Sequence, residues 1–204
     1  MHGDAWTDTE GRIMNWIEII GTLSGLVCVW LLIQRNIWNF PAGMLSAAMF
    51  MVLFTQSGLY ADAGLQIVFI ALNALGLFWW LRGGAEQHGV QIASLSALHF
   101  AFCLAAVALI ALAIHFGLTR WTDSTVAGWD AITTALSLVA QFMLSRKWIA
   151  NWWLWIAADL IYIPLYIHKD LWLTAGLYSV FLVMCIIGLR EWQRAAKTDA
   201  VEQN

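Results

Sequence analysis

Residues 39–82 read NFPAGMLSAAMFMVLFTQSGLYADAGLQIVFIALNALGLFWWLR, and residues 151–194 read NWWLWIAADLIYIPLYIHKDLWLTAGLYSVFLVMCIIGLREWQR. The two stretches align without a gap when Asn39 is placed on Asn151. The other residues that agree in this register include Ala63-Gly64-Leu65 with Ala175-Gly176-Leu177, Val68-Phe69 with Val180-Phe181, Trp80 with Trp192, and Arg82 with Arg194. Because residues as distinctive as Asn, Trp and Arg agree, the alignment indicates an internal duplication.

The composition predicts a membrane protein. Apolar residues make up 61% of the 204 residues and charged residues only 11%, against about 45–50% and about 25% in an ordinary soluble domain. So little charge could not cover the surface of a soluble protein, whereas a bilayer removes the need for a polar surface. Apolar stretches long enough to cross a bilayer lie at residues 16–33, 41–55, 63–81, 92–116, 126–144, 152–167 and 171–189.

The duplication and these seven stretches predict an all-α membrane protein with seven transmembrane helices in a 3+1+3 arrangement. The shift from one copy to the other spans four helices, an even number, so both copies cross the membrane in the same direction. Parallel repeats of this kind are related by an axis along the membrane normal, as in the SWEET carriers. We expect a first repeat at 16–82, a linker helix with flanking loops at 83–125, a second repeat at 126–194, and tails at 1–15 and 195–204.

The distribution of Lys and Arg predicts the orientation. With seven helices the two termini lie on opposite sides of the membrane. One side receives Arg12, Arg120 and Lys169, and the other receives Arg35, Arg82, Arg146, Lys147, Arg190, Arg194 and Lys197. The positive-inside rule places the richer side in the cytoplasm. We therefore expect an extracytoplasmic N-terminal tail and a cytoplasmic C-terminal tail.

Other functional classes find little support in the sequence. The formal net charge of -3 is scattered and includes no basic patch for nucleic acid. The three cysteines lie in apolar runs without metal-ligand spacing, so we expect neither a zinc site nor a disulfide framework. We find no phosphate-binding loop and no G-x-S-x-G nucleophile motif. The sequence therefore predicts a protein that is not an enzyme and that needs no cofactor or metal.

The candidate functional residues are polar and aromatic side chains within the apolar stretches, because polar groups at membrane depth normally face the bundle interior or a water-filled cavity. Trp152, Trp155 and Asp159 are spaced i, i+3, i+7 and share one helical face. Their indole rings could stack on a flat heteroaromatic ring, and a cationic ring would gain about 0.5–2 kcal/mol. The amides of Gln66 and Asn73 could hydrogen-bond a carboxamide or ribose hydroxyls.

Each candidate also has a structural alternative. Tryptophans are enriched at membrane interfaces without any ligand, and Asp159 could be a structural carboxylate hydrogen-bonded within the bundle. Asn39 and Asn151 stand at matching helix starts, where they serve either as helix caps or as ligands. Tyr178 aligns with Gln66 in the duplication, which makes it a candidate in its own right.

The same segments carry a resemblance to a known family. Trp152 and Trp155 match a W-x-x-W motif, Asn151 and Trp155 match N-x-x-x-W, and Tyr60 to Gln66 match YADxxLQ. Over residues 16–194 the chain resembles the PnuC family of bacterial nicotinamide riboside transporters. The resemblance implies a SWEET-like fold, an inner-membrane location, a homotrimer, and facilitated diffusion with uptake driven by a cytoplasmic kinase. It also implies that the cargo could be thiamine or riboflavin, which other members carry.

Three hypotheses follow. The first is a facilitative carrier of nicotinamide riboside, with Trp152 and Trp155 stacked on the pyridinium and with Gln66, Asn73 and Tyr178 on its amide and ribose. The second keeps the fold and changes the cargo to thiamine, whose cationic ring Asp159 would face. The third is an intramembrane enzyme or a structural subunit, against which stand the lack of a catalytic constellation and the matching polar positions of the two repeats.

Overall fold

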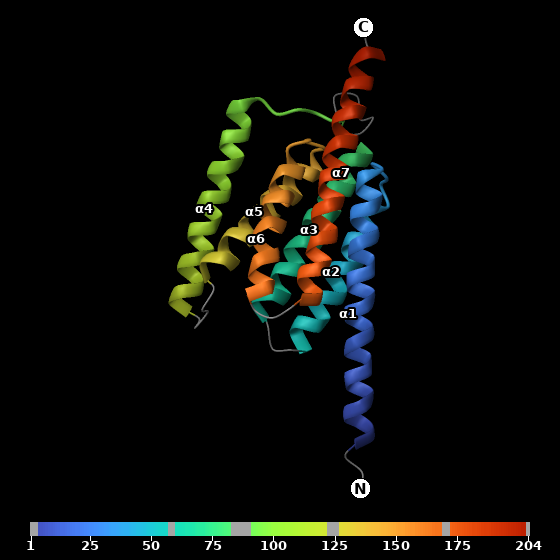
Figure 1. The fold of residues 1–204 in the computed structure, drawn as a ribbon, viewed down its shortest axis with the longest axis vertical. Coiled ribbons are helices and arrows are strands. Elements are labelled where there is room, and N and C mark those ends of the chain that lie inside the picture. The colour runs from blue at the N-terminus through green and yellow to red at the C-terminus, as the bar shows by residue number, and fades with distance from the viewer. Residues whose placement is uncertain (1–3, 57–59, 83–90, 122–126, 169–171, 203–204) are drawn as a thin grey trace. The chain divides into compact units, whose positions relative to one another are not determined.

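The computed structural model describes residues 4–56, 60–82, 91–121, 127–168 and 172–202. Seven α-helices lie in these ranges (Figure 1): α1 (Asp4–Ile33), α2 (Asn39–Gln56), α3 (Tyr60–Arg82), α4 (Ala97–Trp121), α5 (Ala127–Ser145), α6 (Asn151–His168) and α7 (Trp172–Glu202). By length and composition, four of them can cross a membrane, at Trp16–Ile33, Asp62–Arg82, Ala97–Arg120 and Thr174–Thr198. The prediction of an all-α protein with several apolar helices is thus confirmed.

The helix boundaries repeat in the register found in the sequence. In the alignment that places Asn39 on Asn151, the starts of α2 and α6 coincide, and so do the ends of α1 and α5, Ile33 and Ser145. The ends of α2 and α6 and the starts of α3 and α7 also keep this register. From the ends of α1 and α5 to the starts of α3 and α7, the two copies of the duplicated sequence therefore have matching helix bounds.

The turns that join α1 to α2 and α5 to α6 have the same backbone geometry. Arg35 and Lys147 are both left-handed, with φ of 59° and 52°. The N–H of the following residue then donates to a carbonyl near the end of the preceding helix, at 2.9 Å for Asn36 to Leu31 and 3.0 Å for Trp148 to Met143. A left-handed residue followed by such a bond is a common way to end a helix. Equivalent positions of the two copies thus form equivalent helix reversals.

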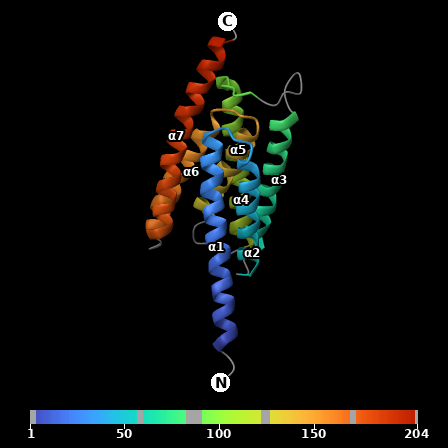
Figure 2. The same cartoon turned by 90° about the vertical axis from the view of Figure 1, so that its right-hand side faces the viewer.

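The chain divides into two compact units, Met1–Leu77 and Phe78–Asn204, with the division inside α3. In the first unit α1 packs along α2 (Figure 2). Ser46 of α2 donates to the Gly21 carbonyl of α1 over 2.8 Å. A Cβ on Gly21 would lie 3.2 Å from the Met49 Cβ, so the small residue lets the two helices approach closely.

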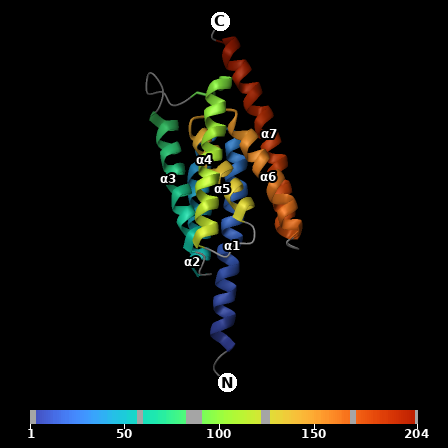
Figure 3. The ribbon, with the colours of Figure 1, turned by 90° about the vertical axis from the view of Figure 1, so that its left-hand side faces the viewer.

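The second unit contains a buried core contributed by three helices. α5 packs against α4 on one side and α6 on the other, and α6 packs against α7 (Figure 3). The shared core consists of Val107, Ala135, Leu136, Val139, Ala140, Met143, Leu154 and Ala158. Ala135 and Ala140 are fully buried. Their small side chains let the neighbouring helices approach closely without leaving a void.

Three predicted boundaries need correction. The fourth helix was expected at 92–116, but α4 begins at Ala97, because Ala93 forms backbone hydrogen bonds with Lys147 and Ile149 of the α5–α6 turn. Ser96 then accepts from the His99 N–H at 3.4 Å, as an N-terminal cap does. This backbone pairing between segments far apart in the chain leaves no periodic signal in the sequence.

The helices at both ends of the chain are longer than expected. Residues 4–15 of the predicted tail belong to α1, and residues 195–202 of the other predicted tail belong to α7. No proline follows Gly188, and Arg194 forms an i, i+3 ion pair with Glu191 at 2.7 Å, so nothing ends α7 after the apolar run. The predicted starts of the fifth and seventh helices, at residues 126 and 171, lie outside the described residues.

Candidate functional site

A stripe of buried polar side chains runs along α5, a helix of mostly apolar residues. Its members follow one another at every fourth position, so they share one face: Thr133, Ser137, Gln141 and Ser145. The hydroxyls of Thr133, Ser137 and Ser145 each donate to the carbonyl one turn earlier, over 2.8 to 2.9 Å. These bonds satisfy the donors and leave the oxygens able to accept, so the stripe can face further polar groups.

Asp159 of α6 is 4% exposed and faces α7. The Cys185 thiol of α7 donates to its carboxylate. The second carboxylate oxygen, Oδ2, is buried and has no hydrogen-bond partner among the described residues. A buried oxygen in this state is unusual, because burying an acceptor without a donor is costly. Asp159 is therefore the strongest candidate functional residue in the second unit.

Three tyrosines from α6 and α7 cluster one turn farther along from Asp159. Tyr162 and Tyr166 of α6 stack with centroids 5.6 Å apart and an interplanar angle of 12°. Tyr178 of α7 packs on both, at 4.7 Å and 5.0 Å. The Tyr162 hydroxyl lies within interaction range of Thr133 and Ser137, and Tyr178 lies near the Asp159 carboxylate. The sequence singled out Tyr178, and the structure adds the hydroxyls of α5 beside the cluster.

Trp152 is enclosed by protein on the α7 side. It is 1% exposed, and its ring lies edge-on to Trp192 with centroids 5.6 Å apart. A Cβ on Gly188 would overlap the tip of the indole, so the ring fills a notch that only glycine leaves open. Its Nε1 is also buried, without a hydrogen-bond partner in the part of the chain that the structure describes. The ring therefore has no face that could stack on a ligand in this arrangement.

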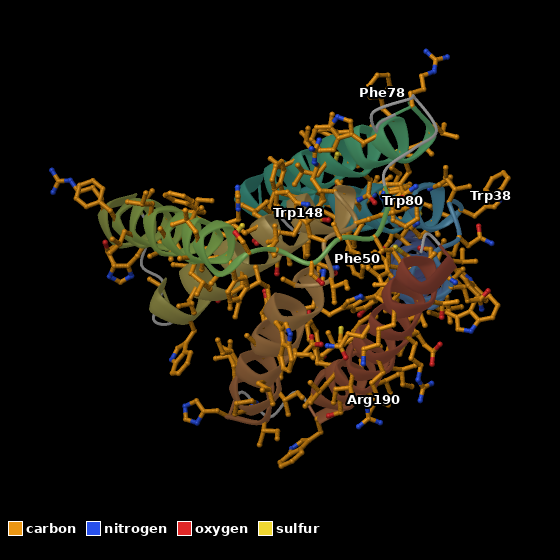
Figure 4. All side chains as sticks on the ribbon, turned by 90° about the horizontal axis from the view of Figure 1, so that it is seen from above. Trp38, Phe50, Phe78, Trp80, Trp148 and Arg190 are labelled. Carbon is orange, nitrogen blue, oxygen red and sulfur yellow. The ribbon has the colours of Figure 1, made fainter. Side chains whose placement is uncertain are left out.

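The contacts between indole rings that begin at Trp152 continue to the end of the second unit near the α5–α6 turn (Figure 4). Trp192 also packs on Trp80, with ring centroids 6.2 Å apart, and the Trp80 indole donates to the Leu144 carbonyl over 3.4 Å. The Lys147 ammonium lies 4.3 Å from the Trp80 ring centroid. Arg190, in contrast, is exposed at the outer edge of α7. This end of the second unit thus holds three indoles in tilted or edge-on contact, with a cation over Trp80.

Trp155 has a different environment from Trp152. It is half-buried and packs beside the core that α4, α5 and α6 share, together with Tyr162. The i, i+3 spacing predicted one aromatic face, but Trp152 turns toward α7 and Trp155 toward α5. The reason is angular, since residues three apart on a helix differ by about 60° in direction. Of the two residues, Trp155 is the one that is partly exposed.

The candidates of the first unit are arranged around α2 and α3. Asn73 is buried, donates to the Phe69 carbonyl over 2.9 Å, and lies so close to Gly43 that a Cβ there would be 2.8 Å from its Oδ1. Gln66 is half-buried. A cavity of about 550 Å³ also lies between α2 and α3, lined by Met51, Val52, Thr55, Gln56, Ala63, Gly64 and Ile67. The structure gives these candidates no common contact within its described ranges.

Asn39 and Asn151 make the same hydrogen bond at the starts of α2 and α6. Each side-chain amide donates over 2.7 Å to the carbonyl three positions earlier, that of Asn36 or Trp148. Both residues are fully buried. This geometry supports the structural alternative for both residues, in which each amide stabilises a helix reversal. The Oδ1 of Asn151 has no hydrogen-bond partner among the described residues.

We expect Asn39→Ala and Asn151→Ala to lower the free energy of unfolding by similar amounts, about 0.5–1.5 kcal/mol each, because each removes the hydrogen bond of a fully buried side-chain amide. Thermal unfolding of the detergent-solubilised protein, followed by tryptophan fluorescence, measures this loss. Asn36→Ala is the control, because the bond that its side chain accepts from Trp38 is exposed. Two variants as stable as the control would contradict the fastening role.

Comparison with known proteins identifies relatives over nearly the whole chain. A family model described as nicotinamide mononucleotide transporter matches residues 15–194. The nicotinamide riboside transporter PnuC of Escherichia coli (strain K12) is 25% identical, over 92% of this chain and 89% of that protein. The riboflavin/roseoflavin transporter RibM of Streptomyces davaonensis is 24% identical, over 96% of this chain and 95% of that protein.

A solved structure has the same fold. The crystal structure of the vitamin B3 transporter PnuC superposes with a TM-score of 0.72 at 20% sequence identity, covering 90% of this chain and 83% of that one. At this identity the likeness concerns the fold alone. Together with the apolar helices, the matches describe a multi-pass protein of the inner membrane.

Proposed function

Since the chain belongs to the nicotinamide mononucleotide transporter family, the PnuC family of vitamin transporters, we propose that it carries nicotinamide riboside across the inner membrane by facilitated diffusion. The observation that supports this cargo best is the similarity to nicotinamide riboside transporters along almost the full length of both chains. The polar and aromatic groups around Asp159 and Trp155 suit a ligand that combines a flat ring with a hydroxylated sugar.

The proposed mechanism uses the duplication. The two three-helix sets form a SWEET-like 3+1+3 arrangement, with α4 as the linker, an extracytoplasmic N-terminus and a cytoplasmic C-terminus. Transport alternates access to a site near the bilayer midplane by rocking one half against the other. Facilitated diffusion only equalises concentrations, so net uptake requires a cytoplasmic kinase that phosphorylates the riboside and traps it. By resemblance to the family, the functional assembly is a homotrimer.

In the proposed site, Trp155 stacks on the pyridinium ring, and Gln66, Asn73 and Tyr178 hydrogen-bond its carboxamide and ribose. Trp152 joins them only if it leaves its notch at Gly188 during the transport cycle, because protein encloses its ring in the present arrangement. Asn39 and Asn151 remain candidates of lower rank, since their amides already fasten the helix reversals.

Two other cargoes are specific alternatives. The similarity to a riboflavin/roseoflavin transporter at almost the same identity favours riboflavin as the second candidate. Thiamine is the third, because its cationic thiazolium ring would suit the same indoles and the Asp159 carboxylate. All three are flat heteroaromatic vitamins or vitamin precursors, so the fold and mechanism would be unchanged.

Calorimetric titration of the purified protein with nicotinamide riboside, riboflavin and thiamine in turn tests the cargo. We expect micromolar or tighter binding of the riboside, and we expect Gln66→Ala to weaken it by about 10-fold through the loss of hydrogen bonds to the ligand. Flux of the same compounds into protein-containing vesicles, with no ion gradient and no ATP, then tests facilitated diffusion. Binding and flux of riboflavin or thiamine alone would reject the riboside and retain the carrier mechanism.

A further inference from the structure

The Asp159 carboxylate is buried and only half satisfied. One oxygen accepts from the Cys185 thiol, while Oδ2 is buried without a partner among the described residues. Ionisable groups inside a membrane bundle are costly, and they normally pair with one another, with backbone groups or with a transported molecule. The second oxygen of Asp159 therefore needs a hydrogen-bond donor that the described residues around it do not provide.

Three positive charges of the second unit have other partners. Among the residues that the structure describes, Arg146 and Lys147 lie over the rings of Trp79 and Trp80, and Arg194 pairs with Glu191. Asp159 lies two turns into α6, about 12 Å along the helix from the end that carries these cations. Within the described ranges, no ion pair accounts for the carboxylate. Its neighbours are instead the neutral Cys185 thiol and the neutral Tyr178 hydroxyl of α7. Tyr178 packs in turn on Tyr162, with ring centroids 4.7 Å apart.

The fold itself does not require this polar set, because the first half forms the same helices without it. In the alignment of the two halves, Asp159 corresponds to Ala47, and Tyr162 and Tyr166 correspond to Phe50 and Phe54. Thr133 and Ser137 correspond to Gly21 and Gly25. Phe50 and Phe54 stack at 5.9 Å, much as the two tyrosines do. The second half thus has one carboxylate and four hydroxyls at positions where the first half has alanine, phenylalanine or glycine.

A half-satisfied carboxylate beside a pair of packed tyrosines suits a ligand with neighbouring O–H groups. The unpaired carboxylate oxygen accepts hydrogen bonds from a vicinal diol, and the tyrosine hydroxyls can both donate to the sugar oxygens and accept from them. An acidic side chain bonded to ribose hydroxyls is a recurring solution in nucleotide-binding folds. A bare organic cation would leave the hydroxyls of this group without a ligand partner.

We infer that Asp159, with Tyr162 and Tyr178, forms a subsite for the vicinal hydroxyl groups of the transported molecule. The inference rests on the proposed function and deepens it, since it names the part of the cargo that the second half recognises. Ribosides and ribityl compounds such as riboflavin carry neighbouring hydroxyls, whereas thiamine does not. The subsite therefore makes the carrier selective for hydroxylated cargo.

The subsite is tested by comparing the affinities of two ligands for two proteins. Calorimetry measures the affinity of the parent and of Asp159→Asn for nicotinamide riboside and for its 2′,3′-dideoxy analogue. We expect the parent to bind the riboside about 10- to 100-fold more tightly than the analogue, because hydrogen bonds to a charged acceptor are strong. In Asp159→Asn we expect this ratio to fall to about 2-fold or less.

The controls separate this subsite from a general loss of binding. Cys185→Ser keeps a donor to Asp159 and is expected to keep the parent ratio, while Tyr178→Phe removes one hydroxyl and is expected to lower it. An unchanged ratio in Asp159→Asn overturns the subsite alone. If that variant does not fold, an unchanged ratio in Tyr178→Phe overturns it instead. A parent that binds the riboside and its analogue equally also overturns the subsite, and a parent that binds neither overturns the proposed cargo as well.

Discussion

Gly188→Ala is expected to lower the free energy of unfolding by about 1–3 kcal/mol, the usual cost of overpacking a filled interior. The new methyl group would overlap the tip of the Trp152 indole and would lie 2.7 Å from its Cζ3. The ring cannot move aside cheaply, because Trp152 is 1% exposed and its ring is packed edge-on against Trp192. Thermal unfolding in detergent should show the loss as a midpoint lowered by several degrees.

Gly176→Ala is the matched control for this effect. Gly176 lies in the same helix, and a Cβ there would meet nothing within 4 Å. We expect it to be neutral or slightly stabilising, because alanine favours a helix over glycine. The double variant Gly188→Ala with Trp152→Phe should recover part of the loss, since the smaller ring makes room for the methyl group. Equal midpoints for the two glycine variants would show that the notch does not constrain Trp152.

The fold could be predicted from the sequence wherever a local signal determined it. The gapless alignment of the two halves located the repeat, and the structure reproduces it in the bounds of α2 and α6 and in the left-handed Arg35 and Lys147. The start of α4 could not be predicted, because it depends on a backbone pairing between Ala93 and the distant α5–α6 turn. A contact between segments far apart in the chain leaves no periodicity in either segment.

The candidate site was predicted in part, for a related reason. A polar residue in an apolar helix is visible in the sequence, and this signal identified Asp159, Asn73 and Tyr178. The stripe from Thr133 to Ser145 carried a similar signal, a polar side chain at every fourth position. The difference between Trp152 and Trp155 was not visible, because it depends on how closely Gly188 of another helix approaches one of the two rings.

Trp155→Ala is expected to weaken binding of nicotinamide riboside by about 10- to 100-fold. When an aromatic side chain that stacks on a base is replaced by alanine, the binding free energy weakens by about 1–3 kcal/mol. Every 1.4 kcal/mol corresponds to about a tenfold change in affinity. A cationic pyridinium gains a further electrostatic attraction to the indole face. Trp155 is the tryptophan of α6 that is partly exposed and packs beside the same core as Tyr162, on the turn before the Asp159 subsite.

Two neighbouring tryptophans provide the controls for this prediction. Trp153→Ala removes an indole that is 53% exposed, as expected of a side chain that faces lipid, so the affinity should stay within about 2-fold. Trp155→Phe keeps an aromatic face and should retain most of the affinity. Because Trp155 also packs on the core of the second unit, the unfolding midpoint of each variant must be measured alongside the titration. If the Trp155→Ala protein is folded and binds as tightly as the parent, Trp155 does not stack on the ligand. The stacking role would then belong to Trp152, which must leave its notch during the transport cycle.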